Sequence, residues 1–333
     1  MIKQEIFNNN LDSILPSKPR HIAVAVSGGS DSMALTILAY NWAITNGVDF
    51  TALTVDHNLR PEARQEAETV GKWCEKYEIH HEILTYSGKI PTSNIEAIAR
   101  EYRYKLLTDY VKSNSIDYLF IAHNQDEQRE TFFLNLARGS GVYGLCGMPV
   151  VSERLGVKII RPMLNFTKAE IKEFLTSISQ EWIEDPSNTD TKYKRVRIRN
   201  LKELIDTLGL SNKRLIDTMN NMTRTRDAVE FFVSECIKKS IISSGSKIII
   251  DRDELLYYPA EVVLRTLAKI IRDFSLSAYP PRLESLENLY VRIKENSLAR
   301  GITLSNTKIS FDKAKNIVIE PEVGRGKKTA GKI

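Results

Sequence analysis

Apolar and polar positions recur with two different periods along the first 180 residues. Short apolar runs predict strands over residues 21–27, 49–57, 80–86, 118–124 and 158–164. Apolar residues spaced three or four apart predict helices over residues 31–46, 61–77, 93–114, 126–139 and 168–179. Alternation of apolar strands with helices is typical of a parallel, doubly wound sheet. We therefore expect an α/β fold here.

The predicted helices begin with residues that suit a helix start. Pro61 fits a first turn, Ser93 or Asn94 fits an N-cap, and Thr167 precedes the helix over 168–179. In a doubly wound sheet the ligand lies outside the carboxyl ends of the strands. Residues that follow the strands are therefore the candidates for chemistry.

The pattern changes to mainly helical from about Tyr193. It predicts two or three helices up to residue 240, a strand over 247–255, helices over 260–274 and 281–298, and a small β-unit over 302–322. We expect an N-terminal catalytic domain, a smaller and mainly helical second domain, and a basic flexible tail, with the bounds 1–205, 206–322 and 323–333.

Composition narrows the class of protein. The chain has 333 residues, 42% of them hydrophobic, and a net charge of +5 that permits a polyanionic partner without requiring one. Cys74, Cys146 and Cys236 are odd in number and form no CxxC pair, which argues against a disulfide framework or a zinc or iron–sulfur site. The chain has neither a signal-peptide pattern nor an apolar run of membrane-spanning length, so we expect a cytoplasmic protein.

The most informative stretch directly follows the first strand. It reads SGGSDS and comprises Ser27, Gly28, Gly29, Ser30, Asp31 and Ser32. Glycines, hydroxyls and a helix N-terminus together form a phosphate cradle. A carboxylate beside a triphosphate becomes useful when it holds a divalent cation, which makes Asp31 a metal candidate. The stretch matches neither the Walker A loop nor G-x-G-x-x-G.

Two further stretches follow predicted strands. VDHNLRP begins at Val55, where the backbone could hold an adenine and the His57 side chain could add a contact. HNQDEQRET places Asp126 and Glu130 four residues apart on one helix face. Asp126 could join Asp31 at the metal, and Glu130 could receive an ammonium group. An acidic first turn that merely stabilises the helix would also explain Asp126.

Basic and glycine-rich segments supply candidates for RNA contact. Glu96, Arg100 and Arg103 lie near one helix face, which fits a functional surface and an ion-pair ladder equally well. The stretch ARGSGVYGLCGMP has four glycines in nine residues, which suits close approach of a nucleotide or base. Five basic residues between 192 and 199 suit a phosphate backbone, although a solvated helix face is the alternative.

Together these motifs resemble one family of PP-loop ATP pyrophosphatases, the tRNA(Ile)-lysidine synthetases. The resemblance covers SGGSDS, VDHNLRP, AREYRY, HNQDEQRET, RGSGVYGLCGMP, RPML and EDPSN, almost continuously over 22–200. It implies a short form without the extra C-terminal domain of longer members. The chain departs from the family at Glu127, where an aspartate is usual, and at Val196, where an asparagine is frequent.

The resemblance implies a two-step reaction with ATP and Mg²⁺. The wobble cytidine of tRNA(Ile) with a CAU anticodon is adenylated with release of pyrophosphate, and free L-lysine then displaces AMP to form lysidine. Carried over by position, Asp31 and Asp126 hold the metal, Arg195 is catalytic and Glu130 binds lysine. The remaining substrate contacts implied are Arg100, Arg138, Gly139 and Arg199. Dimers are common in the family, so a homodimer is expected.

Two other functions fit parts of the sequence. A tRNA 2-thiolase would share the core, but relatives that use iron–sulfur clusters or persulfides need paired cysteines. A non-catalytic nucleotide-binding module would keep the glycine loop without a use for Asp31, Asp126 and Glu130 together. The residues therefore favour the ligase.

Overall fold

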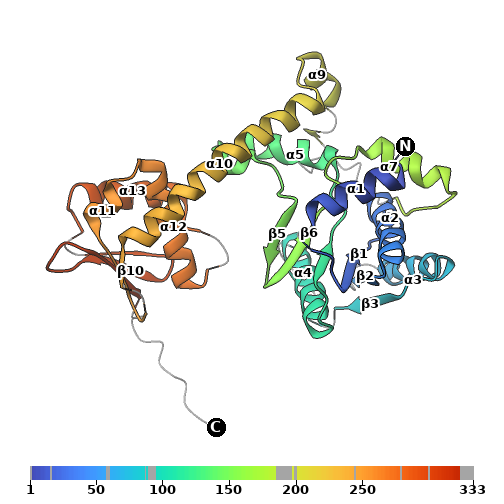
Figure 1. The fold of residues 1–333 in the computed structure, drawn as a ribbon, viewed down its shortest axis with the longest axis horizontal. Coiled ribbons are helices and arrows are strands. Elements are labelled where there is room, and N and C mark those ends of the chain that lie inside the picture. Colours follow the sequence, from blue (N-terminus) through green and yellow to red (C-terminus); the bar gives the residue numbers. More distant parts are fainter. Residues whose placement is uncertain are drawn as a thin grey trace, which may run out of the picture. The chain divides into compact units, whose positions relative to one another are not determined.

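The computed structural model forms two compact units, Met1–Met222 and Thr223–Ile333 (Figure 1). The division lies inside the long helix α10 (Asn212–Ser240), later in the chain than the boundary expected after residue 205. The structure describes residues 2–15, 17–57, 61–86, 88, 95–184, 197–198, 201–243, 245–277, 280–298 and 301–322. The predicted tail over 323–333 and the N-cap predicted at Ser93 or Asn94 lie outside them.

The first unit alternates strands and helices as predicted. Its strands are β1 (His21–Ala25), β2 (Asp49–Asp56), β3 (His81–Thr85), β4 (Tyr118–Phe120), β5 (Val151–Arg154) and β6 (Val157–Ile160). Its helices are α1 (Gln4–Ile14), α2 (Ser30–Asn46), α3 (Pro61–Lys76), α4 (Ile95–Ser113), α5 (Gln125–Leu136), α6 (Val142–Leu145), α7 (Lys168–Ser177), α9 (Lys202–Thr207) and the start of α10.

The strands of this unit form one sheet in the order β3-β2-β1-β4-β6-β5. The pairs β3–β2, β2–β1, β1–β4 and β4–β6 are parallel, and β5 joins the edge as an antiparallel hairpin with β6. The predicted doubly wound α/β class is therefore confirmed. The hairpin strand β5 and the helix α1 were not predicted.

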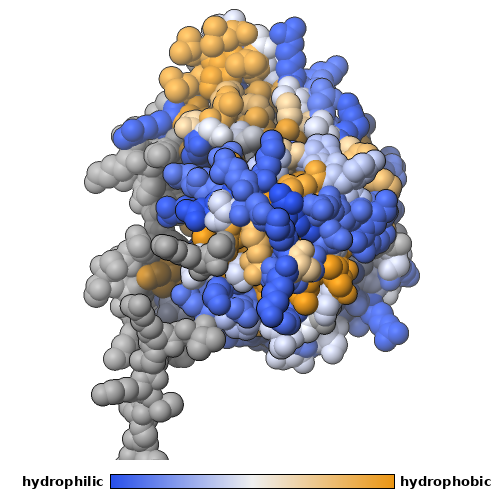
Figure 2. All heavy atoms as spheres, turned by 90° about the vertical axis from the view of Figure 1, so that its left-hand side faces the viewer, coloured by the Kyte–Doolittle hydropathy of each residue, from blue (hydrophilic) through white to orange (hydrophobic). Residues whose placement is uncertain are grey.

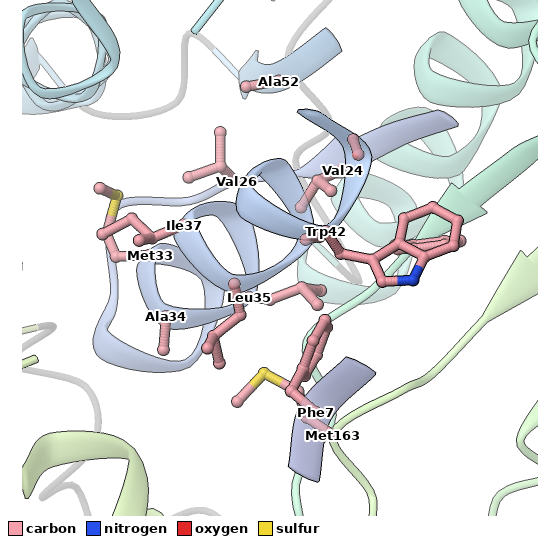
Figure 3. Packing of buried hydrophobic residues seen from close by; sticks show 14 of the residues in the cluster. Phe7, Val24, Val26, Met33, Ala34, Leu35, Ile37, Trp42, Ala52 and Met163 are labelled. Atoms are coloured by element: carbon pink, nitrogen blue, oxygen red, sulfur yellow. The ribbon is translucent and has the colours of Figure 1, made fainter. Parts of the chain in front are cut away.

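Helices cover both faces of the sheet because its strands are apolar on both sides. In β1, Ile22 and Val24 pack into a core shared with α1, α2, α3 and α7, whereas Ala23 packs toward α4. Figure 3 shows Phe7 of α1 and Met163 meeting the buried side of α2 around Leu35. This packing fixes α2, whose first turn follows the glycine loop.

Polar side chains set where two helices of the site begin. Thr167 caps α7 through a capping box with Glu170, as predicted from its position. Asn124 caps α5 in the same way with Glu127, so β4 is shorter than the predicted strand over 118–124. Both helix starts lie at the carboxyl ends of the strands, which is the ligand side of such a sheet.

The second unit combines helices with a sheet. The five-stranded antiparallel sheet among its described residues has the order β7-β8-β11-β10-β9. Its elements are β7 (Ile241–Ser243), β8 (Ile248–Ile250), α11 (Arg252–Leu256), α12 (Ala260–Ser275), α13 (Leu283–Lys294), β9 (Ile302–Leu304), β10 (Thr307–Phe311) and β11 (Ile317–Pro321). The strand predicted over 247–255 ends at Ile250, because Asp251 caps α11 with its side chain.

A group of leucines around α9 is exposed, although leucine side chains on a helix usually pack against a neighbouring element. Leu201, Leu204 and Leu208 around α9 are 48%, 58% and 70% exposed. Figure 2 shows apolar side chains gathered at the top of the view, the end at which Figure 1 draws α9. Among the described helices, none has the length and apolar character needed to cross a bilayer.

Candidate active site

The loop after β1 has a shape that only glycine permits at its second position. Gly28 has φ +82°, in the left-handed region that side chains rarely adopt. A Cβ atom there would lie 2.7 Å from Ile183 Cδ1 and 2.9 Å from Val70 Cγ2. The Ile183 N–H also donates to the Gly28 carbonyl at 2.9 Å, so residues just beyond α7 press directly on the loop.

The serines of the loop have different surroundings. The Ser32 hydroxyl donates to the Gly29 carbonyl at 2.9 Å and accepts from the Ser27 N–H at 3.1 Å. Ser32 therefore shapes the loop in this structure, whereas the sequence suggested only a phosphate donor. Ser30 is buried in the first turn of α2, and Gly29 is the N-cap of that helix. The N-terminus of α2 therefore directly follows the glycine loop, and a helix N-terminus next to such a loop is a typical binding site for an anion.

A cavity of ≈ 390 Å³ lies beside this loop, within the size range of small-ligand sites. Val55 and His57 line it together with Ser27, Gly29 and Asp31 of the loop. The structure thus brings the two predicted nucleotide segments into one cavity. Burial lowers the pKa of His57, and the positive charge of Arg103 lowers it further.

A polar pair, of which Thr54 is buried and His81 is half-buried, supports the floor of the cavity. The Thr54 hydroxyl donates to the Val26 carbonyl at 2.9 Å and lies 2.8 Å from His81 Nε2. Because the hydroxyl proton is used on Val26, His81 must donate through Nε2. Burial lowers the pKa of His81 to about 4, so the ring is neutral near pH 7. This pair joins β1, β2 and β3 below the ligand side.

The two predicted metal carboxylates are linked through Asn124 and Lys168, neither of which was predicted as a site residue. Asp31 Oδ1 accepts from Asn124 Nδ2 at 3.0 Å, and Asp31 Oδ2 accepts from Lys168 Nζ at 2.6 Å. Asp126 Oδ2 accepts from the backbone N–H of Lys168 at 2.8 Å. Asn124 and Lys168 therefore tie together the starts of α2, α5 and α7.

This donor set suits magnesium carried by a nucleotide. Among the described residues, no group of three His, Cys, Asp or Glu side chains is arranged to hold a metal. Mg²⁺ usually takes one or two protein carboxylates and completes its shell with phosphate oxygens and water. Asp31 and Asp126 provide such carboxylates beside the phosphate loop, so the residues fit an ATP-borne Mg²⁺.

The helix α5 holds Glu130 and a buried arginine beside it. Glu130 is only 3% exposed, and Arg129 is 4% exposed. Arg129 donates to Asp206 Oδ1 at 3.2 Å and to Asn212 Oδ1 at 3.0 Å. The position of Glu130 is therefore tied, through its neighbour in the helix, to α9 and the start of α10. No local pattern singles out Arg129, because its partners lie more than 70 residues away along the chain.

A group of arginines surrounds Tyr104 at the cavity wall. The guanidinium carbons of Arg154 and Arg100 lie 3.9 Å and 5.3 Å from the centre of the Tyr104 ring. Burial lowers the pKa of Arg103, and the like charges of Arg100 and Arg154 lower it further. Such a concentration of positive charge favours an anionic ligand. The predicted residue Arg100 belongs to this group, whereas Arg154 was not predicted.

Arg161 fixes the orientation of a histidine in the same wall. Its Nε donates to His123 Nδ1 at 3.1 Å, so that ring nitrogen carries no proton. The other guanidinium contacts go to the Pro149 carbonyl and the Ser152 hydroxyl, at 2.9 Å and 2.8 Å. Burial lowers the pKa of Arg161. The RPML motif, which begins at Arg161, thus supports the cavity from the next strand.

Seven predicted residues that the structure describes do not line the cavity, namely Gly28, Ser30, Arg100, Asp126, Glu130, Arg138 and Gly139. Arg138 and Gly139 are exposed after α5, where Gly139 has φ +71° and ends the helix, and neither lines the cavity. Arg195 and Arg199 lie outside the described residues. Gln128 holds the end of the glycine-rich segment. Its Oε1 accepts from the Met148 N–H at 2.6 Å, and its Nε2 donates to the Met148 carbonyl at 2.8 Å.

The cysteines have no arrangement for sulfur chemistry. Cys74, Cys146 and Cys236 are free and buried. Burial raises the pKa of Cys74 to about 12, which suppresses its reactive thiolate form.

Comparison with known proteins agrees with the fold. A family model of the PP-loop domain matches residues 3–207. The U34-tRNA thiolase NcsA from Methanococcus maripaludis has a similar fold, with a TM-score of 0.55 and 16% identity over 66% of this chain and 78% of that chain. The class defined by fold and site is therefore that of the PP-loop proteins.

Relatives of known name specify the family. The tRNA(Ile)-lysidine synthase of Wolbachia pipientis wMel is 37% identical over 310 residues, which cover 91% of this chain and 71% of the relative. That of Hyphomonas neptunium is 34% identical and covers 91% of this chain and 82% of the relative. This chain belongs to the tRNA(Ile)-lysidine synthase family.

Proposed function

We propose that this chain ligates free L-lysine to C2 of the wobble cytidine of tRNA(Ile) with a CAU anticodon, using ATP. The observation that carries the proposal is the meeting of the glycine loop, Asp31 and the adenine segment at Val55 and His57 in one cavity. Family membership supplies the class of substrate. The three segments together suit a nucleotide whose phosphates end at the N-terminus of α2.

The first step adenylates the base. The cytosine O2 attacks the α-phosphorus of ATP, the bond to the β-phosphate oxygen breaks, and pyrophosphate leaves. Backbone N–H groups of the loop and the N-terminus of α2 bind the phosphates. Asp31 and Asp126 would hold Mg²⁺, which would neutralise charge that develops on the leaving oxygens.

The second step transfers lysine. The lysine ε-amine attacks C2 of the activated base, AMP leaves with the bonding electron pair, and the amine loses a proton. We propose that Glu130 binds an ammonium group of lysine and so positions the substrate. Its burial in α5, next to Arg129 and its partners, gives a rigid carboxylate rather than a mobile surface group.

The RNA contacts come from the basic side of the site. Arg100 is exposed beside Tyr104, and this exposed positive charge supports our assignment of Arg100 to an RNA phosphate. We also assign Arg195, Arg199, Arg138 and Gly139 to tRNA or adenylate binding, with Arg195 acting in catalysis. The anticodon base must leave its stack to reach the α-phosphate, as is usual when enzymes act on loop bases. We further place the enzyme in the cytoplasm as a homodimer.

Mass analysis of the tRNA tests this function. Isoleucine tRNA is incubated with the enzyme, ATP and lysine, digested to nucleosides and analysed by mass spectrometry. The proposal predicts a cytidine that has gained one lysine less one water, and only when both ATP and lysine are present. A cytidine of unchanged mass, or a product that contains additional sulfur, would contradict the proposal.

A further inference from the structure

Lys168 places a positive charge on the carboxylate assigned to the metal. It is the first residue of α7, directly after the cap Thr167. Its backbone N–H donates to Asp126 at 2.8 Å, and its ammonium group reaches Asp31 Oδ2 at 2.6 Å. One residue therefore contacts both proposed metal carboxylates. It contacts one through the main chain and the other through the side chain.

Both oxygens of Asp31 have donors in this arrangement. Asn124 donates to Oδ1 and Lys168 donates to Oδ2. Asn124 is neutral, so Lys168 provides the compensating charge. The ion pair is partly shielded, since the Asp31 side chain is 23% exposed. A cation that binds Asp31 through Oδ2 must therefore displace the ammonium group.

We propose that Lys168 keeps the metal site closed until ATP arrives. To bind alone, a divalent cation would have to break the Lys168–Asp31 ion pair and lose part of its tightly held water, and it would gain only two carboxylate ligands. Its binding free energy would therefore be small. ATP changes this balance because its phosphates supply further oxygen ligands and negative charge. Metal binding and ATP binding are then coupled through Asp31. This inference rests on the proposed function only in placing the ATP phosphates beside Asp31.

The released ammonium group has a use in the bound state. Lysine has a long flexible stem and three donors, so it can turn from Asp31 toward a phosphate oxygen. The charge that balanced Asp31 in the free enzyme would then balance the triphosphate. Lys168 is thus a positioning residue that acts through Asp31 and the phosphates.

The control is one turn further along the same helix. Lys172 pairs with Glu184 at 2.8 Å, and its side chain is 41% exposed, the same fraction as that of Lys168. Its carboxylate partner is Glu184, which follows α7, whereas that of Lys168 is Asp31. Lys172→Met therefore removes the same charge from the same helix without changing the metal carboxylates.

The test measures Mn²⁺ binding to protein that contains no nucleotide. Free Mn²⁺ is followed by electron paramagnetic resonance, with and without ATP whose α–β bridging oxygen is replaced by methylene. We expect Lys168→Met to bind Mn²⁺ without nucleotide at least about tenfold more tightly than the wild type. Lys172→Met and Lys168→Arg should behave like the wild type, and all four proteins should bind Mn²⁺ with the analogue.

The double variant Lys168→Met with Asp31→Asn locates the effect. It should lose the gained affinity, which shows that the metal binds at Asp31. If Lys168→Met does not fold, judged by its circular dichroism, Lys168→Gln replaces it in every measurement. Equal Mn²⁺ affinity of the folded variant and the wild type would overturn the inference.

The assay needs neither tRNA nor lysine, so it separates the inference from the proposed function. Lysidine formation by the wild type together with unchanged Mn²⁺ affinity in Lys168→Met would overturn the role of Lys168 alone. Conversely, tighter Mn²⁺ binding that depends on Asp31 would support that role even if the enzyme modified no tRNA.

Discussion

At the residue scale, the proposed phosphate site depends first on the backbone of Gly28. An alanine there would take a left-handed conformation, which costs about 1–2 kcal/mol, and would displace Val70 and Ile183. We predict that Gly28→Ala lowers the unfolding free energy by that amount and weakens ATP binding severely. Titration calorimetry and chemical unfolding measure the two effects.

Gly245→Ala is the matched control for that change. Gly245 lacks a positive φ, and a Cβ atom there would meet no heavy atom within 4 Å. We expect its ATP affinity to equal that of the wild type. If Gly28→Ala also bound ATP normally, the loop would not be the phosphate site.

A second residue prediction concerns the lysine step. Glu130→Gln removes the carboxylate charge with little change in size, so lysine binding should fail while adenylation continues. We predict that adenylated tRNA accumulates and that the lysine KM rises at least about tenfold, as expected for a lost charged contact. Chromatography of the tRNA products and lysine titration provide the measurements.

The exposed carboxylate of Glu173, on α7, provides the control. Glu173→Gln makes the same charge change and should leave the lysine KM unaltered. A normal KM in Glu130→Gln would remove Glu130 from the lysine site.

Site residues that directly follow a strand could be predicted from the sequence, whereas the residues that contact them from distant parts of the chain could not. Asp31 and His57 were found because their places after β1 and β2 follow from local pattern. Lys168 lies 137 residues from Asp31, and Ile183 contacts Gly28 from beyond α7. Local periodicity carries no information about such pairs. Only the packing of α7 against α2 brings them together.

At the element scale, the start of α7 determines where Lys168 lies. Thr167 accepts from the Glu170 N–H at 3.2 Å and so caps the helix. Loss of such a cap costs about 1 kcal/mol. We predict that Thr167→Ala lowers the unfolding free energy by this amount and reduces the rate of pyrophosphate release, since Lys168 and Asp126 meet at the same turn.

Thr176→Ala tests whether the effect comes from the cap. Thr176 is exposed near the end of α7 and donates to the Lys172 carbonyl at 2.9 Å. Its loss should cost less than about 0.5 kcal/mol. Equal destabilisation by the two variants, measured by denaturant unfolding, would show that the cap is not the cause.

Most elements of the first unit followed from periodicity, and the exceptions have physical reasons. The helix α1 contains three consecutive asparagines, which are poor helix formers. Tertiary packing stabilises it instead, through fully buried Phe7 and Leu11 and through the hydrogen bond from Trp42 to Asp12 at 2.8 Å. Likewise, β5 is an edge strand whose residues alternate between exposed and half-buried with none fully buried, so its sequence lacks the apolar run of a core strand.

At the scale of the whole molecule, one half-buried histidine predicts the acid stability of the first unit. The folded pKa of His81 is about 4, against 6.5 for an ordinary histidine. The unfolded chain therefore takes up a proton below pH 6.5 that the folded chain does not accept. Stability present above pH 6.5 is lost as the pH falls toward 4.

Because solvent screens a half-buried group, the pKa shift of His81 contributes less than its full value to stability. We expect the free energy of unfolding to fall by about 1–2 kcal/mol between pH 6.5 and pH 4. Urea unfolding at a series of pH values measures it. His81→Gln should flatten this dependence, whereas His80→Gln, at the exposed neighbour, should keep most of it. An unchanged pH dependence in His81→Gln would contradict the assignment.

The division into two units was the feature least accessible from the sequence. The described elements between residues 201 and 240 are the helices α9 and α10, and the division between the units lies within α10 after Met222. The first half of that helix packs on α5 through Leu215 and Met219. Its second half packs in the other core through Val233 and Cys236. A continuous helical pattern in the sequence does not reveal that the two halves of the helix pack into different hydrophobic cores.

The most direct test of the account is the identity of the nucleotide product. Purified enzyme is incubated with labelled ATP and isoleucine tRNA that carries an unmodified CAU anticodon, with and without lysine, and the products are separated by chromatography. The account predicts pyrophosphate in both reactions and free AMP in the reaction with lysine. Formation of ADP and phosphate would contradict it, because the loop would then direct attack at the terminal phosphate.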